Sequence, residues 1–298
     1  MKIYVVTDLE GVAGVYQWEN RDDASLENQE RRCRQRRWLA EEVNAMADGL
    51  HAGGATDIWI NDGHGAGYTI DLELVRPGVR IEHGSGRPQY CTGLDDSFAG
   101  LGSLGTHAMG GTPHASLAHT MGLGIKSYSL NGVKVGETGY QAFLAGYYGV
   151  PYVFCAGDLA ACREMAELCP GCVTVPVKVG LSLLSALTVT PQRARQMIRE
   201  GAEEAMGRVG TVKPLAIEGP VVFRDEWHKP IFDPENPPKH SRVIDSHTRE
   251  IEAENMKDFM DKMYGYAPSY RPLWADHPEV LPHPGDTKEA NGHKGLRH

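Results

Sequence analysis

Short, predominantly apolar runs recur along the chain, and each is bounded by glycine, proline or polar residues. Runs of this length, rich in β-branched and aromatic residues, predict buried strands rather than helices. The runs are residues 2–8, "ATDIWIND", residues 79–83, "PYVFCAGD" and "CVTVPVKVG". The dipeptide Asn131-Gly132 inside "SYSLNGVKVGE" predicts a tight hairpin, because both residues tolerate positive φ.

Segments with helical patterns separate these strands. Residues 24–51 are rich in Glu, Arg, Leu and Ala and end before a glycine pair, and "TPQRARQMIREGAEEAMGRV" begins with a Thr cap and a proline. Residues 138–148 and 159–168 are two further helices. Alternating strands and helices predict an α/β fold, a largely parallel sheet flanked by helices. In such sheets the functional site lies at the carboxyl ends of the strands.

The pattern changes after about residue 213, where shorter strand-like runs precede the helical segment "MKDFMDKMYGY". We therefore expect an α/β domain over residues 1–213 and a smaller C-terminal α+β unit over residues 214–267. Residues 268–298 are polar and proline-rich, with few large apolar side chains to bury, and are expected to form an extended C-terminal arm.

Composition and charge exclude several classes of protein. The 298 residues are 41% hydrophobic and 23% charged, as in globular proteins. A net charge of −9 without a basic stripe argues against nucleic acid or an anionic membrane as a partner. Residues 31–37 are basic but flanked by glutamates, which predicts a solvated helix face. No apolar stretch approaches the length of a membrane span, and the amino end lacks the pattern of a signal peptide.

The six cysteines include the pair in "CPGC", Cys169 and Cys172, which has the spacing of redox or zinc pairs. No second pair of this spacing accompanies it, so structural free thiols are the favoured interpretation. A reducing, cytoplasmic location fits this cysteine usage best.

Carboxylates and histidines gather where the predicted strands end. Asp8 and Glu10 close the first strand and, two residues apart, point the same way. Further along the chain, "INDGHG" contributes His64, "GTHA" contributes His107 and "VGETG" contributes Glu137. Taken singly, each histidine is more often a structural residue.

Together these residues predict a metal site. Two carboxylates side by side repel unless a cation lies between them, and histidine and carboxylate are ligands of zinc and similar divalent ions. Five such ligands suit two divalent metal ions, most simply Zn²⁺, bridged by one carboxylate.

The same motifs carry a family resemblance as a linked set. They are "TDLEG", "NDGH", "GLDDSF", "GTHA", "AHTM" and "NGVKVGETGYQAFLAGYYGVPYVFCAGD". At this spacing the chain resembles the zinc-dependent D-aminopeptidase family over about residues 1–215. The resemblance implies Asp8 as the bridge between two zinc ions, with the other ligands divided between them. It pairs Glu10 with His64 on one ion, and His107 with Glu137 on the other.

The resemblance also implies a catalytic histidine, His119, in the segment "AHTM". The gap from His107 to His119 is one residue longer than is typical of the family, and His114 within that gap could compete for the role. Thr106 replaces a tyrosine of the family pattern, and Gln141 replaces an asparagine. These departures concern substrate preference and assembly rather than the metal ligands.

The favoured function is a di-metal aminopeptidase or amidohydrolase that cleaves short peptides with a free amino end, including peptides of D-residues. A di-metal phosphoesterase is the first alternative, although residues 61–70 and 103–125 contain no Lys or Arg to hold phosphate. The second alternative is a non-catalytic metal-binding protein. The resemblance implies a ring-like homo-oligomer, and Trp274 in the C-terminal arm is expected near a subunit contact.

Overall fold

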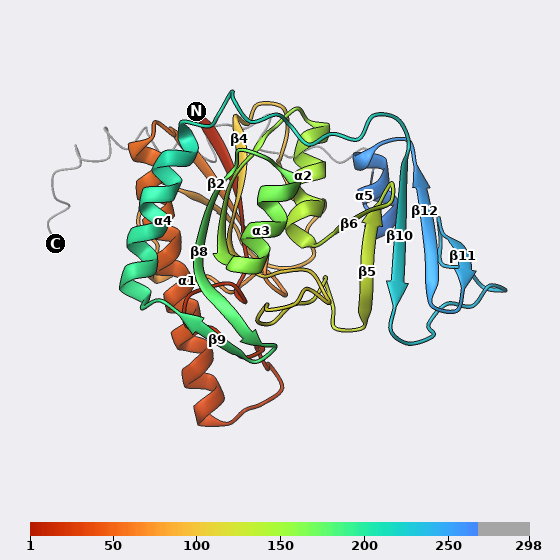
Figure 1. The fold of residues 1–298 in the computed structure, drawn as a ribbon, viewed down its shortest axis with the longest axis horizontal. Coiled ribbons are helices and arrows are strands. Elements are labelled where there is room, and N and C mark those ends of the chain that lie inside the picture. Colours follow the sequence, from red (N-terminus) through yellow and green to blue (C-terminus); the bar gives the residue numbers. More distant parts are fainter. Residues whose placement is uncertain (268–298) are drawn as a thin grey trace, which may run out of the picture.

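A seven-stranded sheet forms the centre of the computed structural model, which describes residues 1–267 (Figure 1). The order is β3-β2-β1-β4-β7-β8-β9, and all neighbours are parallel except β8 and β9. Its strands are β1 (Lys2–Thr7), β2 (Asp57–Asp62), β3 (Arg80–Glu82), β4 (Gly100–Thr106), β7 (Tyr152–Asp158), β8 (Val173–Ser182) and β9 (Ser185–Thr188). This confirms the predicted α/β class with a largely parallel sheet.

Helices cover both faces of this sheet. They are α1 (Leu26–Ala52), α2 (Glu137–Tyr147), α3 (Leu159–Leu168) and α4 (Pro191–Met206), with a short 3₁₀ helix, η1 (Leu72–Leu74). Figure 1 shows α1 beside α4, away from α2 and α3. The first pair approaches closely at Gly49, where a Cβ atom would lie 2.1 Å from the main-chain oxygen of Arg199.

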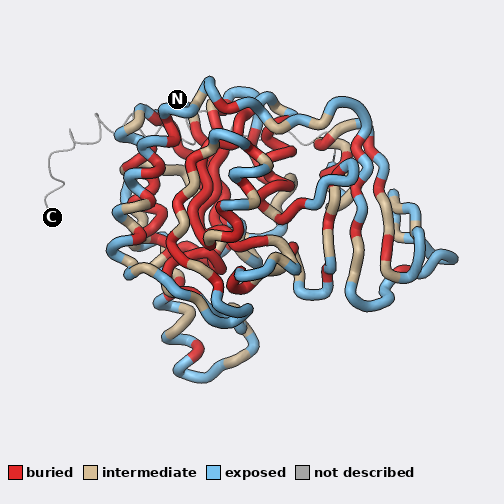
Figure 2. The backbone as a smooth tube through the Cα atoms, in the orientation of Figure 1, coloured by how far each residue is buried: buried red, intermediate tan, exposed pale blue. Residues whose placement is uncertain are grey.

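The alternation of side chains along β1 explains why both faces are covered. Ile3 and Val5 belong to the apolar cluster that includes α1 and α4, whereas Tyr4 and Val6 belong to the cluster that includes α2 and α3. β4 and β7 are buried along their whole length, and Figure 2 shows these central strands in red. The strands therefore run through a buried core and reach the site at their carboxyl ends.

A second, antiparallel sheet stands beside the first, with the order β11-β12-β10-β5-β6 (Figure 1). Its strands are β5 (Ile125–Leu130), β6 (Val133–Val135), β10 (Val221–Trp227), β11 (Arg242–Asp245) and β12 (Thr248–Ala253), and α5 (Met256–Tyr264) packs on it. Asn131 and Gly132 join β5 to β6 with φ of 47° and 84°, which confirms the predicted hairpin. Strands from the middle of the chain thus pair with strands from its end.

The six cysteines are free thiols, and Cys169 and Cys172 follow the end of α3. No helix within residues 1–267 is long and apolar enough to cross a membrane. The predicted C-terminal arm, residues 268–298 with Trp274, lies outside the described residues.

Candidate metal centre

The predicted site residues converge where the central strands of the parallel sheet end. Asp8 follows β1, and its main-chain N–H donates to the oxygen of Leu104 in β4 at 2.8 Å. Gly105 (φ 74°) makes this approach possible, because a Cβ there would lie 2.1 Å from the main-chain oxygen of Asp8. His64 follows β2, and His107 follows β4 directly. Strand register thus places three side chains from distant positions at one edge.

One group of potential ligands consists of Asp8, Glu10 and His64, whose ligand atoms lie within 4.8 Å of one another. His64 Nδ1 is 3.1 Å from Asp8 Oδ1 and 2.9 Å from Glu10 Oε2. Glu10 is buried, and its Oε2 makes no hydrogen bond of normal geometry despite this short distance. A buried carboxylate oxygen this close to an imidazole nitrogen forms a pair of potential ligand atoms that suits a shared cation.

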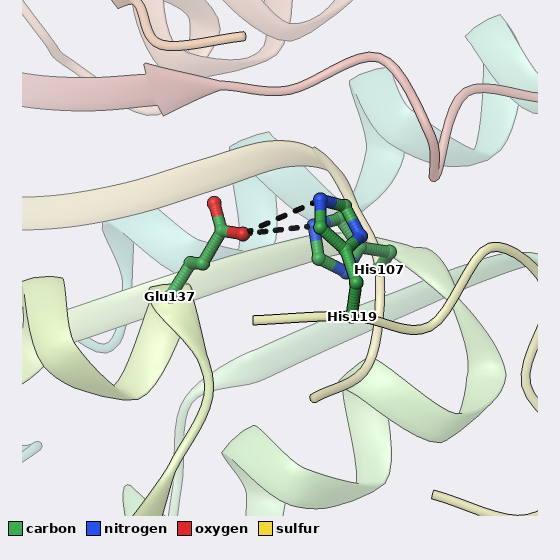
Figure 3. A group of neighbouring side chains, drawn as sticks. All are labelled: His107, His119 and Glu137. Atoms are coloured by element: carbon green, nitrogen blue, oxygen red, sulfur yellow. Dashed lines mark ion pairs between the residues drawn. The ribbon is translucent and has the colours of Figure 1, made fainter. Parts of the chain in front are cut away.

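The second group consists of His107, His119 and Glu137 (Figure 3). Glu137 is the first residue of α2, and its Oε1 lies 3.4 Å from His107 Nε2 and 3.7 Å from His119 Nε2. The two imidazole rings are stacked, with centroids 4.0 Å apart. Glu137 Oε1 also accepts a hydrogen bond from the main-chain N–H of Met121 at 2.6 Å, which fixes the carboxylate.

Main-chain oxygens orient both stacked histidines. His107 Nδ1 is 2.9 Å from the oxygen of Ala108, and His119 Nδ1 is 3.0 Å from the oxygen of Leu117. Because a carbonyl oxygen only accepts, each Nδ1 must carry the hydrogen and donate it. The lone pair of each neutral ring therefore lies on Nε2, on the side that faces Glu137.

Asp8 connects the two groups. Its Oδ1 lies 3.1 Å from His64 Nδ1, and its Oδ2 lies 3.1 Å from His107 Nε2. A carboxylate with one oxygen toward each group has the arrangement needed to bridge two ions. The donor set of carboxylate oxygens and imidazole nitrogens also fits zinc.

The electrostatics of the site favour positive charge. Burial acts to raise the pKa of Asp8, but the charge of His107 and hydrogen bonds from both neighbouring histidines outweigh it and hold that pKa well below its usual value. Burial raises the pKa of Glu10, and the charge of Asp8 adds to the effect. Burial opposes protonation of His64 and His107, yet the surrounding carboxylates raise both histidine pKa values well above 6.5. The carboxylates therefore favour protons bound on His64 and His107, and a divalent ion at the same place would supply more positive charge.

A cleft of about 440 Å³ opens beside the site, within the size range of small-ligand pockets. Asp8, His64, His119 and Glu137 line it, and so does Gln141, whose Nε2 donates to the Tyr90 hydroxyl at 3.3 Å. Thr106 also lines the cleft. The two departures from the family pattern, Thr106 and Gln141, thus border the space open to a substrate.

His114, the alternative candidate, is exposed and lies in neither ligand group. All six site residues predicted from the sequence come together, whereas three contributors were not predicted. Glu19 lies 3.4 Å from His64 Nε2, and the Trp18 ring meets His119 edge-on at 5.1 Å. Lys178, buried in β8, donates to the main-chain oxygens of Glu10 and Val15. Of these three residues, only Lys178 has a recognisable signal in the sequence, because it is a lysine within an apolar strand.

Glu19 is a fixed anion next to the site. Burial acts to raise its pKa, but hydrogen bonds from His64, Arg21 and Arg32 outweigh burial and lower the pKa of Glu19 to about 2. It is therefore ionised at any pH near neutrality.

Comparison with known proteins gives consistent matches. Residues 1–263 match a protein-family model described as D-aminopeptidase. A D-aminopeptidase of Bacillus subtilis (strain 168) is 33% identical over 217 residues, which cover 72% of this chain and 77% of the relative. The solved structure of "Zn-dependent D-aminopeptidase DppA from Bacillus subtilis, a self-compartmentalizing protease" superposes with a TM-score of 0.80 at 28% identity, over 91% of this chain and 100% of that chain.

The family match corrects one expectation. The motifs indicate a resemblance that ends near residue 215, but the match continues to residue 263. This extension includes β10, which pairs with β5, so residues on both sides of position 215 belong to one sheet.

Proposed function

The chain belongs to the D-aminopeptidase family, a family of metallopeptidases, and from this premise we propose that it uses two zinc ions to hydrolyse short peptides with a free amino end, including peptides of D-residues. The observation that carries this proposal is the carboxylate of Asp8, whose two oxygens each face a histidine of a different ligand group. The zinc dependence named for the Bacillus subtilis structure supports the choice of metal.

Each ligand has a distinct part in this proposal. Asp8 would bridge the two ions, Glu10 and His64 would complete one site, and His107 and Glu137 would complete the other. Divalent ions, when bound there, polarise a carbonyl oxygen and lower the pKa of a water toward about 7. Asp8, His64 and His107 follow β1, β2 and β4, so the central sheet sets their positions.

His119 is the proposed acid–base residue. Its Nδ1 donates to the oxygen of Leu117, so the Nε2 lone pair faces the site and can accept a proton from the attacking water. The same atom can then deliver that proton to the departing amine. Trp18 on one side and His107 on the other restrict rotation of the ring.

The cleft does not favour a phosphoesterase. Arg87 lines it, but its Nη1 donates to Asn61 Oδ1 at 2.5 Å, and its Nη2 donates to the main-chain oxygens of Asp62 and Glu82. A guanidinium bound in this way is not available to clamp a phosphate.

We also propose that the protein works as a homo-oligomer. The support is the description of the similar Bacillus subtilis structure as a self-compartmentalizing protease. In such an assembly, access to the cleft would be limited to short peptides.

The test is hydrolysis of D-alanine and L-alanine p-nitroanilides by the purified protein, before and after chelation and with zinc added back. We expect faster cleavage of the D-substrate, loss of activity with chelator, and recovery at two zinc ions per chain. Activity that survives complete removal of metal would contradict the proposal, and a clear preference for the L-substrate would contradict the assigned substrate class.

A further inference from the structure

The segment between β1 and α1 places two consecutive residues, Trp18 and Glu19, against two different histidines of the site. We propose that Glu19 is a positioning residue that orients His64 for metal binding and strengthens zinc affinity at that ligand group. The inference rests on the proposed zinc function of the site.

The two nitrogens of His64 face opposite partners. Nδ1 points to Asp8 Oδ1 and Glu10 Oε2, the atoms with which it would share an ion, whereas Nε2 lies 3.4 Å from Glu19 Oε2. Only a nitrogen without hydrogen can bind a metal. A carboxylate next to Nε2 keeps the hydrogen on that atom and leaves the Nδ1 lone pair free for the ion.

Glu19 is itself held firmly. Its Oε2 accepts a hydrogen bond from Arg21 Nε at 2.8 Å, and its Oε1 accepts one from Arg32 Nε at 3.0 Å. The side chain is only 5% exposed, so few rotamers are open to it. Arg32 lies on α1, which packs on the central sheet, and this contact ties the irregular segment to the core.

The expected effect follows from the chemistry of outer carboxylates. A carboxylate that accepts from the second nitrogen of a ligating histidine fixes the ring and raises its basicity, and its loss typically costs 10- to 100-fold in metal affinity. The contact of Trp18 with His119 places the same segment against a histidine of the other ligand group as well.

The experiment measures zinc dissociation constants of the full-length protein by competition with a chromophoric chelator. The variants are Glu19→Ala and Glu19→Gln, and the control is Asp22→Ala, which removes an exposed charge from the same segment. We expect Glu19→Ala to weaken one zinc about 10- to 100-fold and Glu19→Gln to weaken it less, since an amide oxygen still accepts from Nε2. Asp22→Ala should leave both constants unchanged, and excess zinc should restore turnover in Glu19→Ala.

Several outcomes would overturn the inference. Parental zinc affinity in Glu19→Ala would show that His64 needs no such partner. An equal loss of zinc affinity in Asp22→Ala would attribute the effect to negative charge alone. Turnover of Glu19→Ala that excess zinc does not restore would indicate a general structural role. A parent chain that binds no zinc would instead refute the proposed function together with this inference.

Discussion

Each carboxylate oxygen of Asp8 faces a different ligand group, so substitution of Asp8 is the most informative single change. We expect Asp8→Ala to retain neither zinc ion after dialysis, because each carboxylate oxygen faces a different group. Asp96→Ala, which removes an exposed carboxylate, should bind the same zinc as the parent. Elemental analysis of zinc per chain provides the measurement, and full zinc content in Asp8→Ala would exclude the bridging role.

Substitution of His119 tests proton transfer separately from metal binding. We expect His119→Ala to keep its zinc while turnover of the D-substrate falls about 10²- to 10⁴-fold, the usual contribution of a positioned acid–base group. His114→Ala serves as the control and should stay near the parental rate, since His114 lies outside both ligand groups. Loss of zinc from His119→Ala would reassign the residue as a ligand beside Glu137, 3.7 Å away.

At this scale the strand pattern predicts the residues that follow strands, the family motif adds His119, and Glu19 is missed. Asp8, His64 and His107 each come directly after an apolar run, so their common edge follows from the parallel sheet. Glu19 lies in a segment without periodicity, and its partner is far along the chain. Only the folded course of that segment brings them together.

Among the elements, β8 and α1 brace the segment that carries Glu10. Lys178 of β8 donates to the main-chain oxygens of Glu10 and Val15, and Glu42 of α1 accepts from the main-chain N–H of Ala13 at 3.1 Å. Burial lowers the pKa of Lys178 to about 8 and raises that of Glu42 to about 8. Two buried titratable groups thus hold one loop.

Glu42 gives a pH dependence with a definite sign. Folded Glu42 keeps its proton up to a pH of about 8, whereas the unfolded carboxyl releases it above about 4.5. Its contribution to the free energy of unfolding is therefore full below about pH 4.5 and is lost as the pH rises to about 8. Glu42→Gln mimics the protonated, neutral carboxyl and should remove this decline of the unfolding free energy with pH.

The measurement is urea unfolding of the zinc-loaded parent and variants at several pH values between 5 and 9. Glu41→Gln, the neighbouring and partly exposed carboxylate, should leave the slope unchanged. Glu42→Ala should lower the free energy of unfolding by about 1–3 kcal/mol near neutrality, because it leaves the N–H of Ala13 without an acceptor. A Glu42→Gln curve parallel to the parent would show that Glu42 is ionised in the folded protein.

Elements were predictable where their pattern is local. The predicted helix over residues 24–51 corresponds to α1, and the Asn131-Gly132 turn joins β5 to β6. The pairing of β5 with β10 could not be predicted, because antiparallel neighbours distant in sequence leave no periodic signal. The second sheet is therefore known from the structure and could not be predicted from the sequence.

For the whole molecule, the C-terminal arm, residues 268–298, is the segment that the sequence predicts at a subunit contact. We expect a chain that ends at residue 267 to have a lower mass by light scattering than the full-length oligomer, because the arm has few apolar groups of its own to bury and would pack on a neighbouring subunit. Full-length protein at the same concentration is the reference. An oligomer unchanged by the deletion would exclude the arm as the subunit contact, and a monomeric full-length protein would exclude the oligomer.

The pairing of β5 and β10 also sets the order in which the protein can mature on the ribosome. Residues 1–137 supply all five proposed ligands, yet β6 leads directly into Glu137 and shares a sheet with β10, which is synthesised much later. Until β10 emerges, the edge of β5 has no partner and the position of Glu137 lacks its support. We expect a nascent chain to remain inactive as a peptidase until β10 has left the ribosome and paired with β5.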